Sequence, residues 1–147
     1  MTPKEQQAND YFQQGYSCAQ SVFAAFHEEM GLDETFALKL MLSMGGGVSG
    51  LRETCGAFTA AAMAINMIRP DVAPDDAEGK QQIYAAVQDK AEKFKAAYGT
   101  VICRDLLDRL GVTASPAKKT GGDNADRPCA EYVRRCARLV EEELGKG

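Results

Sequence analysis

The stretch Thr54–Ile68, TCGAFTAAAMAINMI, decides the fold of this chain. From Ala57 to Ile68 it is apolar nearly all round, and only Thr59 and Asn66 interrupt it. A helix with that composition has no face for water, so we expect it in the middle of a helical bundle. The apolar run is shorter than the ~20 residues that a bilayer crossing needs, so we predict a buried helix and no membrane span.

The composition extends this prediction to the whole chain. The 147 residues include 22 Ala against 8 Val and 4 Ile, a balance that favours helix over strand. No run of four or more residues alternates apolar and polar between turn signals, as a half-buried strand would. We predict an all-α fold: a compact bundle of about six or seven helices around the apolar helix at 54–68, forming one domain over residues 1–147.

Charge and the N-terminus restrict the function classes. Lys plus Arg is 17 and Asp plus Glu is 21, which gives a net charge of −4. This balance argues against nucleic acid as a partner, because such proteins need a basic face to displace phosphate counterions. The opening residues MTPKEQQAND contain no basic-then-apolar export signal, so we expect a cytoplasmic protein. The sequence is compatible with a homo-oligomer, although it contains no clear heptad repeat of the kind that forms a coiled coil.

Capping signals divide the chain into helices. Thr2-Pro3-Lys4-Glu5 and Ser17-Cys18-Ala19-Gln20 are capping boxes, and they predict two N-terminal helices. A long amphipathic helix is expected after residues 70–79, and an exposed loop from Gly111 to Ala125. The predicted bounds of the other helices are Ser17 to Met30, Asp33 to Met44, Thr54 to Ile68, Thr100 to Leu110 and Pro128 to Leu144, with Asp33, Thr54, Thr100 and Pro128 at the starts.

The cysteines are the candidate functional residues of this sequence. No two of them form a C-x-x-C pair, so zinc-finger, zinc-ribbon and thioredoxin-type motifs lack support. Four of them fall in the first turn of a predicted helix, where unpaired N–H groups and the helix dipole favour a thiolate. A nearby arginine would favour the thiolate further. The four are Cys18, Cys55, Cys103 and Cys129, with Arg52 near Cys55, Arg104 beside Cys103 and Arg127 near Cys129.

Each of the four cysteines also lies on an apolar stripe, so we expect the thiols to point inward, toward one another. The competing interpretation is that they are small core residues, since cysteine is often buried. Cys136 is the fifth cysteine, and its Cα lies about 10.5 Å from that of Cys129 on one helix. That separation is too long for a disulfide. An odd cysteine count in a reducing compartment also argues against a structural disulfide framework.

Three other features do not indicate a site. Residues 45–50, GGGVSG, match G-x-G-x-x-G by letter, but the dinucleotide motif must follow a strand, and this stretch follows a helical segment. We expect a helix–helix connection whose glycines let backbone approach Cys55. The single histidine, His27, is predicted to be half-buried or on the surface, and the run Glu141-Glu142-Glu143 to be a solvated helix end.

Several of these strings together resemble the C-GCAxxG-C-C family, small proteins described as redox-active and named for four cysteines. The strings are GYSCAQSVFAAF from Gly15, GGGVSGLRETCGAFTAA from Gly45, Ile102-Cys103-Arg104-Asp105-Leu106-Leu107, and Cys129 before Tyr132-Val133. The resemblance implies that Cys18, Cys55, Cys103 and Cys129 are the functional cysteines, and it hints at a transport-associated partner. Ala60 stands where the family name has glycine, and Cys136 lies outside the pattern.

Three functions follow as hypotheses. The first is a thiol-based redox protein, in which Cys55 is the reactive thiolate and Cys18, Cys103 or Cys129 resolves it as a disulfide. The second is a metal- or cluster-binding module in which Cys18, Cys55, Cys103 and Cys129 bind zinc or an iron–sulfur cluster. The third is a non-catalytic helical interaction domain. Substrate, redox partner, disulfide connectivity and the role of Cys136 stay open.

Overall fold

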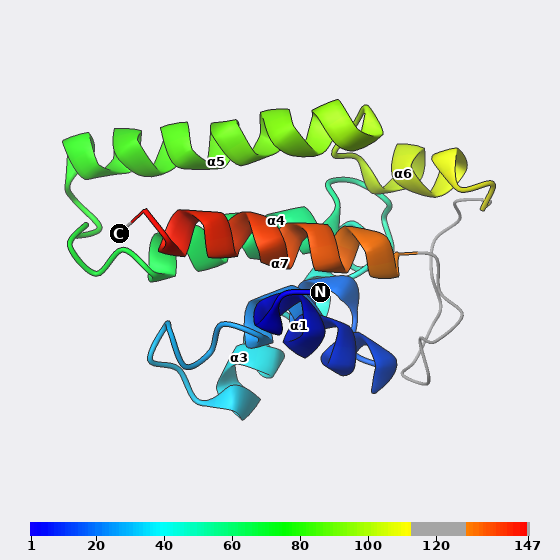
Figure 1. Ribbon diagram of the computed structural model, residues 1–147, viewed down its shortest axis with the longest axis horizontal. Helices are drawn as coiled ribbons and strands as arrows, with labels where there is room; N and C mark the ends of the chain where they lie inside the picture. The colour runs from blue at the N-terminus through cyan, green and yellow to red at the C-terminus, as the bar shows by residue number, and fades with distance from the viewer. Residues whose placement is uncertain (113–128, 147) are drawn as a thin grey trace.

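The computed structural model describes residues 1–112 and 129–146, and within these ranges the chain is helical (Figure 1). The helices are α1 (Pro3–Gln13), α2 (Cys18–Ala24), α3 (Glu34–Leu40), the 3-10 turn η1 (Leu42–Met44), α4 (Gly56–Met67), α5 (Ala77–Tyr98), α6 (Cys103–Arg109) and α7 (Ala130–Leu144). The only strand-like pairing in the described residues is an isolated antiparallel bridge between Thr54 and Ile102. The predicted all-α fold is confirmed.

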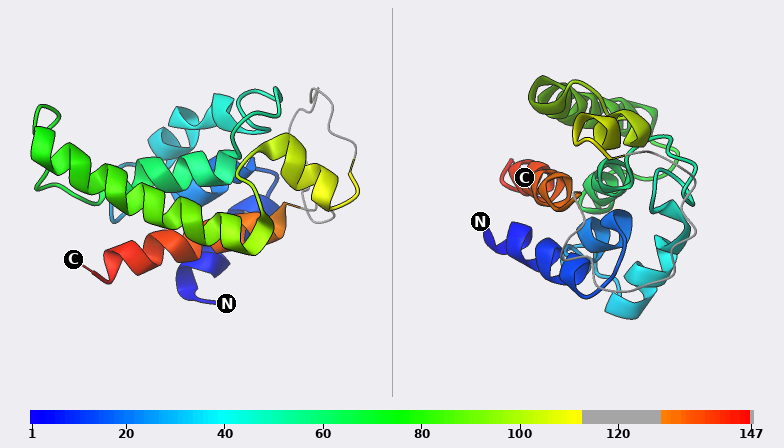
Figure 2. Two further views of the ribbon diagram at one scale, coloured as in Figure 1. Left: turned by 90° about the horizontal axis from the view of Figure 1, so that it is seen from above. Right: turned by 90° about the vertical axis from the view of Figure 1, so that its right-hand side faces the viewer.

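Helix α4 is the centre of the bundle, as its sequence predicts. It packs against α2, α5 and α7, which surround it in Figure 2. Its small side chains Ala57, Ala60 and Ala64 are fully buried, so the neighbouring backbones approach closely. Helix α1 completes the bundle by packing against α2 and α7. In the ranges that the structure describes, no helix has both the length and the hydropathy for a membrane crossing.

The N-terminal caps form as predicted. Thr2 and Ser17 each accept a hydrogen bond from a backbone N–H in the first turn, and each capping box is completed by Glu5 or Gln20. Asp33 caps α3 through the backbone N–H of Phe36, at 3.1 Å. These caps satisfy N–H groups that have no partner within the helix.

Two predicted helices are shorter than expected. Helix α2 ends at Ala24, and the chain then tightens into turns, in which the Phe26 N–H donates to the Phe23 carbonyl. The predicted helix through Met44 breaks at Met41, whose side chain is fully buried, and resumes as η1. In both places, tighter turns replace the predicted continuation of the helix.

Two predicted caps are wrong for one reason. Thr54 and Ile102 form the antiparallel bridge, so their backbone is extended and the helices begin after it. Cys55, not Thr54, is therefore the N-cap residue of α4, and Ile102, not Thr100, is that of α6. Arg127, Pro128 and most of the predicted loop from Gly111 to Ala125 lie outside the described residues.

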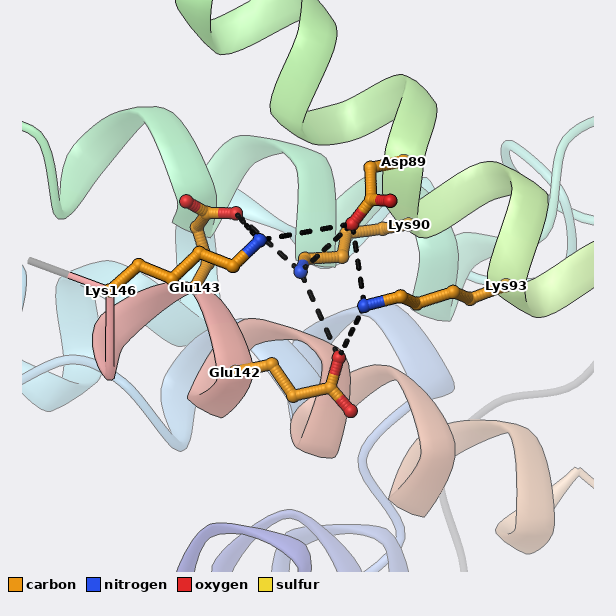
Figure 3. A network of polar contacts seen from close by, with 6 residues as sticks. All are labelled: Asp89, Lys90, Lys93, Glu142, Glu143 and Lys146. Atoms are coloured by element: carbon orange, nitrogen blue, oxygen red, sulfur yellow. Dashed lines mark hydrogen bonds and ion pairs between the residues drawn. The ribbon is translucent and has the colours of Figure 1, made fainter.

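A charged network joins α5 to the C-terminal half of α7 (Figure 3). The side chain of Lys90 is fully buried, and its Nζ lies 3.3 Å from Asp89, 3.5 Å from Glu143 and 3.8 Å from Glu142. Lys93 and Lys146 extend the network at its exposed edge. The prediction of a solvated helix end at Glu141-Glu142-Glu143 is therefore wrong for Glu143, whose side chain is only 11% exposed.

Candidate functional site

Four cysteines from four helix starts line one small cavity. Its volume is about 20 Å³, close to the room that a single water molecule needs. Among the lining residues that belong to the described ranges, Arg52 is the only charged one. The lining residues are Cys18, Cys55, Cys103 and Cys129, with Gly46, Arg52, Gly56, Leu106, Leu107 and Tyr132.

Each cysteine reaches the cavity from the N-terminal end of its helix. Cys18 and Cys103 are the first residues of α2 and α6, whereas Cys55 and Cys129 are the N-cap residues of α4 and α7. Cys129 is half-buried and the other three are buried. The structure thus brings together the four predicted site residues, and all five cysteines of the chain are thiols.

A short backbone pairing holds Cys55 and Cys103 near each other. The Cys55 N–H donates to the Val101 carbonyl at 2.8 Å, and the Cys103 N–H donates to the Glu53 carbonyl at 2.6 Å. The two cysteines therefore flank the bridge on one face, because side chains alternate along a strand. Such diagonal neighbours lie roughly 7–8 Å apart between Cα atoms.

The glycine segment, residues 45–50, reaches the cavity by close backbone approach, and Gly46 is one of the lining residues. Gly47 has a φ of +67°, and a Cβ added to it would lie 2.7 Å from Cys103 Cβ and 2.6 Å from the Glu53 backbone nitrogen. The sequence predicted a close approach to Cys55, but the contact is with Cys103. The segment follows η1 and not a strand, so it lacks the context of a dinucleotide-binding loop.

Arg52 brings the positive charge to Cys103. Its Nη1 donates a hydrogen bond to Cys103 Sγ at 3.7 Å. Its backbone has a φ of +64°, a conformation that non-glycine residues rarely adopt. The Arg52 N–H donates to the Gly46 carbonyl, and the Arg52 carbonyl accepts from the Arg104 N–H. Arg104, which the sequence placed beside Cys103, has an exposed side chain.

Burial dominates the electrostatics of Cys55. It raises the pKa of this thiol well above its ordinary value, and the neighbouring sulfur of Cys18 acts in the same direction. The backbone N–H groups of Phe58 and Ala57 offset this only in part. At Cys55, desolvation exceeds the effect of the helix N-terminus and disfavours the thiolate form.

The remaining candidates lie outside the cavity. Cys136 is fully buried in the core, and burial raises the pKa of its thiol well above the ordinary value. His27 is half-buried, and its Nδ1 lies 3.1 Å from the Leu32 carbonyl oxygen, in keeping with the predicted structural role. Sequence reasoning missed Tyr132, whose hydroxyl donates to the Leu106 carbonyl at 3.0 Å and ties α7 to α6 beside the cavity.

The metal-binding alternative finds no matching ligand set in the described ranges. There, no group of three or more Cys, His, Asp or Glu side chains is placed to hold a metal ion. The four thiols share a cavity, yet they do not form the tetrahedral donor set that zinc or an iron–sulfur cluster requires.

Comparison with known proteins gives a family that agrees with this geometry. The family model described as "Putative redox-active protein (C_GCAxxG_C_C)" matches residues 16–143. The chain belongs to this family. The resemblance drawn from the cysteine-containing strings is thereby confirmed. No curated protein and no solved structure matches the chain.

Within the C_GCAxxG_C_C family pattern, two departures can now be placed. Ala60, where the family name has glycine, is fully buried in the interior of α4 and does not line the cavity. Cys136, the cysteine outside the pattern, lies in the core on α7 and also does not line the cavity. The four cysteines implied by the family resemblance are the four that share it.

Proposed function

We propose that this C_GCAxxG_C_C protein is a thiol-based redox protein that stores two electrons as a pair of thiols and releases them by forming a disulfide. One observation carries the proposal: four cysteines, far apart in sequence and on four helices, line one small cavity. Cysteines that served only as core residues would have no reason to meet there. The cytosol suits such a protein, because reducing conditions there restore the thiols.

The roles within the cluster differ from the simplest sequence-based assignment. A thiolate attacks and a second thiol resolves the product as a disulfide. Cys103, beside the Arg52 guanidinium, is the better attacking group, since a neighbouring cation stabilises a thiolate. Cys55, whose pKa burial raises, is the better resolving thiol. Cys18 and Cys129 complete the cluster as further thiols for exchange.

The test is a thiol count after the reduced protein is exposed to hydrogen peroxide or, separately, to oxidised glutathione, followed by peptide mapping. The reduced chain has five cysteines, and we expect oxidation to consume two thiols of the cavity. Cys55→Ala and Cys103→Ala should each abolish the Cys55–Cys103 disulfide, and the matched control Cys136→Ala should leave it intact. Full retention of all five thiols with both oxidants, in protein that stays folded, would favour the structural interpretation of the cysteines.

A further inference from the structure

We infer that the oxidant for this cavity is a small hydroperoxide, hydrogen peroxide itself, and not the disulfide of a protein or of glutathione. The inference rests on the proposed function and names the substrate class of that same site. Three features support it: the size of the cavity, the burial of three of the sulfurs, and the guanidinium of Arg52 beside one of them.

The size of the cavity limits what reaches the sulfurs. A volume of about 20 Å³ admits a molecule little larger than water. Hydrogen peroxide has two heavy atoms, whereas a disulfide substrate must bring two sulfurs with their carbon substituents. Cys18, Cys55 and Cys103 are 7%, 5% and 8% exposed. An incoming disulfide would have to line up with one of these three buried sulfurs, and a cavity of this size disfavours that; Cys129, the half-buried member of the cluster, is the more accessible thiol.

The polarity of the cavity fits a peroxide. Leu106 and Leu107 supply apolar walls, and Arg52 supplies a positive charge. Its guanidinium has several N–H donors in a planar fork, and one of them points at Cys103 Sγ. A peroxide that approaches this sulfur from the cavity would meet a nucleophile, and the adjoining guanidinium, which donates to the sulfur at 3.7 Å, would lie beside the departing oxygen as a hydrogen-bond donor.

The first step balances without any further reagent. The Cys103 thiolate attacks one oxygen of HO–OH, an S–O bond forms, and the O–O bond breaks. The departing hydroxide takes up the proton that the thiol released, so the products are a Cys103 sulfenic acid and water. Sulfur loses two electrons and the peroxide gains them.

The second step uses the neighbour across the backbone bridge. Cys55 sulfur attacks Cys103 sulfur, an S–S bond forms, and the S–OH bond breaks. The hydroxyl leaves with the Cys55 proton as a second molecule of water. The bridge between Thr54 and Ile102 sets the two cysteines as diagonal neighbours, so a small shift closes the disulfide, which needs a Cα separation below about 7 Å.

The experiment compares three oxidants on the reduced full-length chain: hydrogen peroxide, cumene hydroperoxide and oxidised glutathione. Thiol loss gives a second-order rate constant for each, and the urea-unfolded chain gives the reference reactivity of its thiols. We expect the rate constant for hydrogen peroxide to be at least about tenfold larger with the folded protein than with the unfolded protein. With the folded protein, it should also be about tenfold larger than the rate constant for cumene hydroperoxide. The product should be the Cys55–Cys103 disulfide.

Variants assign the effect to the cation. Arg52→Met should slow the hydrogen peroxide reaction by about tenfold, Arg52→Lys should retain part of the rate, and the exposed control Arg104→Met should not change it. The oxidant comparison on the unaltered chain needs no variant to fold. Oxidation by glutathione disulfide, with hydrogen peroxide no faster than in the unfolded chain, would overturn this inference and leave the proposed function intact. If none of the three oxidants consumed thiols of the folded protein, both this inference and the proposed function would be overturned.

Discussion

The guanidinium of Arg52 points at the sulfur of Cys103, 51 positions away in sequence and 3.7 Å away in space, and not at Cys55, only three positions along the chain. Two thiols in one cavity thereby differ in their electrostatic surroundings. Cys55 and Cys103 have nearly the same exposure, 5% and 8%. The contact with the guanidinium, not access to solvent, therefore distinguishes Cys103 from Cys55.

We predict that Cys103 is alkylated before Cys55 in the reduced protein at neutral pH. Burial raises the pKa of Cys55, so this thiol is protonated at pH 7, and only the thiolate reacts. Limited treatment with iodoacetamide followed by peptide mass mapping measures the order. Arg52→Met should reduce the ratio of the alkylation rate of Cys103 to that of Cys55, whereas Arg104→Met should leave this ratio unchanged. Labelling of Cys55 ahead of Cys103 in the unaltered protein would contradict the roles assigned here.

The close approach of the glycine segment leads to a second prediction. Gly47→Ala places a Cβ against the Glu53 backbone at a position with φ of +67°, so we expect a loss of about 3 kcal/mol in the free energy of unfolding. Gly31→Ala is the matched control. It has a similar φ of +69° but nothing within 4 Å of an added Cβ, and should cost about 1 kcal/mol. Urea denaturation measures both, and equal losses would show that packing against Cys103 is unimportant.

Much of the bundle follows from local sequence signals. The apolar run from Ala57 predicts the central helix, and Thr2, Ser17 and Asp33 mark helix starts correctly, because capping depends on neighbouring residues only. The shared orientation of Cys18, Cys55, Cys103 and Cys129 is likewise foreshadowed by their places at helix starts.

The features that sequence reasoning missed depend on contacts between distant segments. The bridge of Thr54 to Ile102 moves two caps, and no local pattern announces a single bridge. The contact of the Arg52 guanidinium with the Cys103 sulfur depends on that same bridge, which brings residues 52–55 beside residues 101–104. The burial of Lys90 depends on the packing of α5 against α7, so a lysine that is typical of an exposed helical face becomes a core residue.

Removal of the Lys90 charge should destabilise the fold. Lys90→Met keeps the length of the side chain but leaves Glu143, with a side chain only 11% exposed, without its buried cation. We expect a loss of about 3 kcal/mol in the free energy of unfolding. Lys93→Met is the matched control from the same helix and network. Because its side chain is 47% exposed, water screens the charge, and the change should be small. Chemical denaturation distinguishes the two, and a neutral Lys90→Met would show that the network contributes little.

The reduced protein should lose stability as the pH rises above about 9. Burial raises the pKa of both Cys55 and Cys136 above the ordinary value of 9.0, so the folded state keeps protons that the unfolded chain releases. This contribution is complete below pH 9 and declines with a slope of about 1.4 kcal/mol per pH unit for each thiol. Burial also raises the pKa of Tyr98 and Tyr132 above 10.0, which adds to the decline only at higher pH. Denaturation between pH 8 and 10 under a non-thiol reductant measures the slope.

Cys136→Ala separates the two thiols in that experiment. The variant lowers stability at every pH through the lost side-chain volume, but it should also remove one thiol from the pH dependence. The mean slope between pH 9 and 10 should therefore become shallower by about 1 kcal/mol per pH unit relative to the unaltered protein, since the unfolded thiol is only partly ionised over that interval. An identical slope in both proteins would mean that the Cys136 thiol titrates alike in the folded and unfolded chains, in conflict with its complete burial in the core.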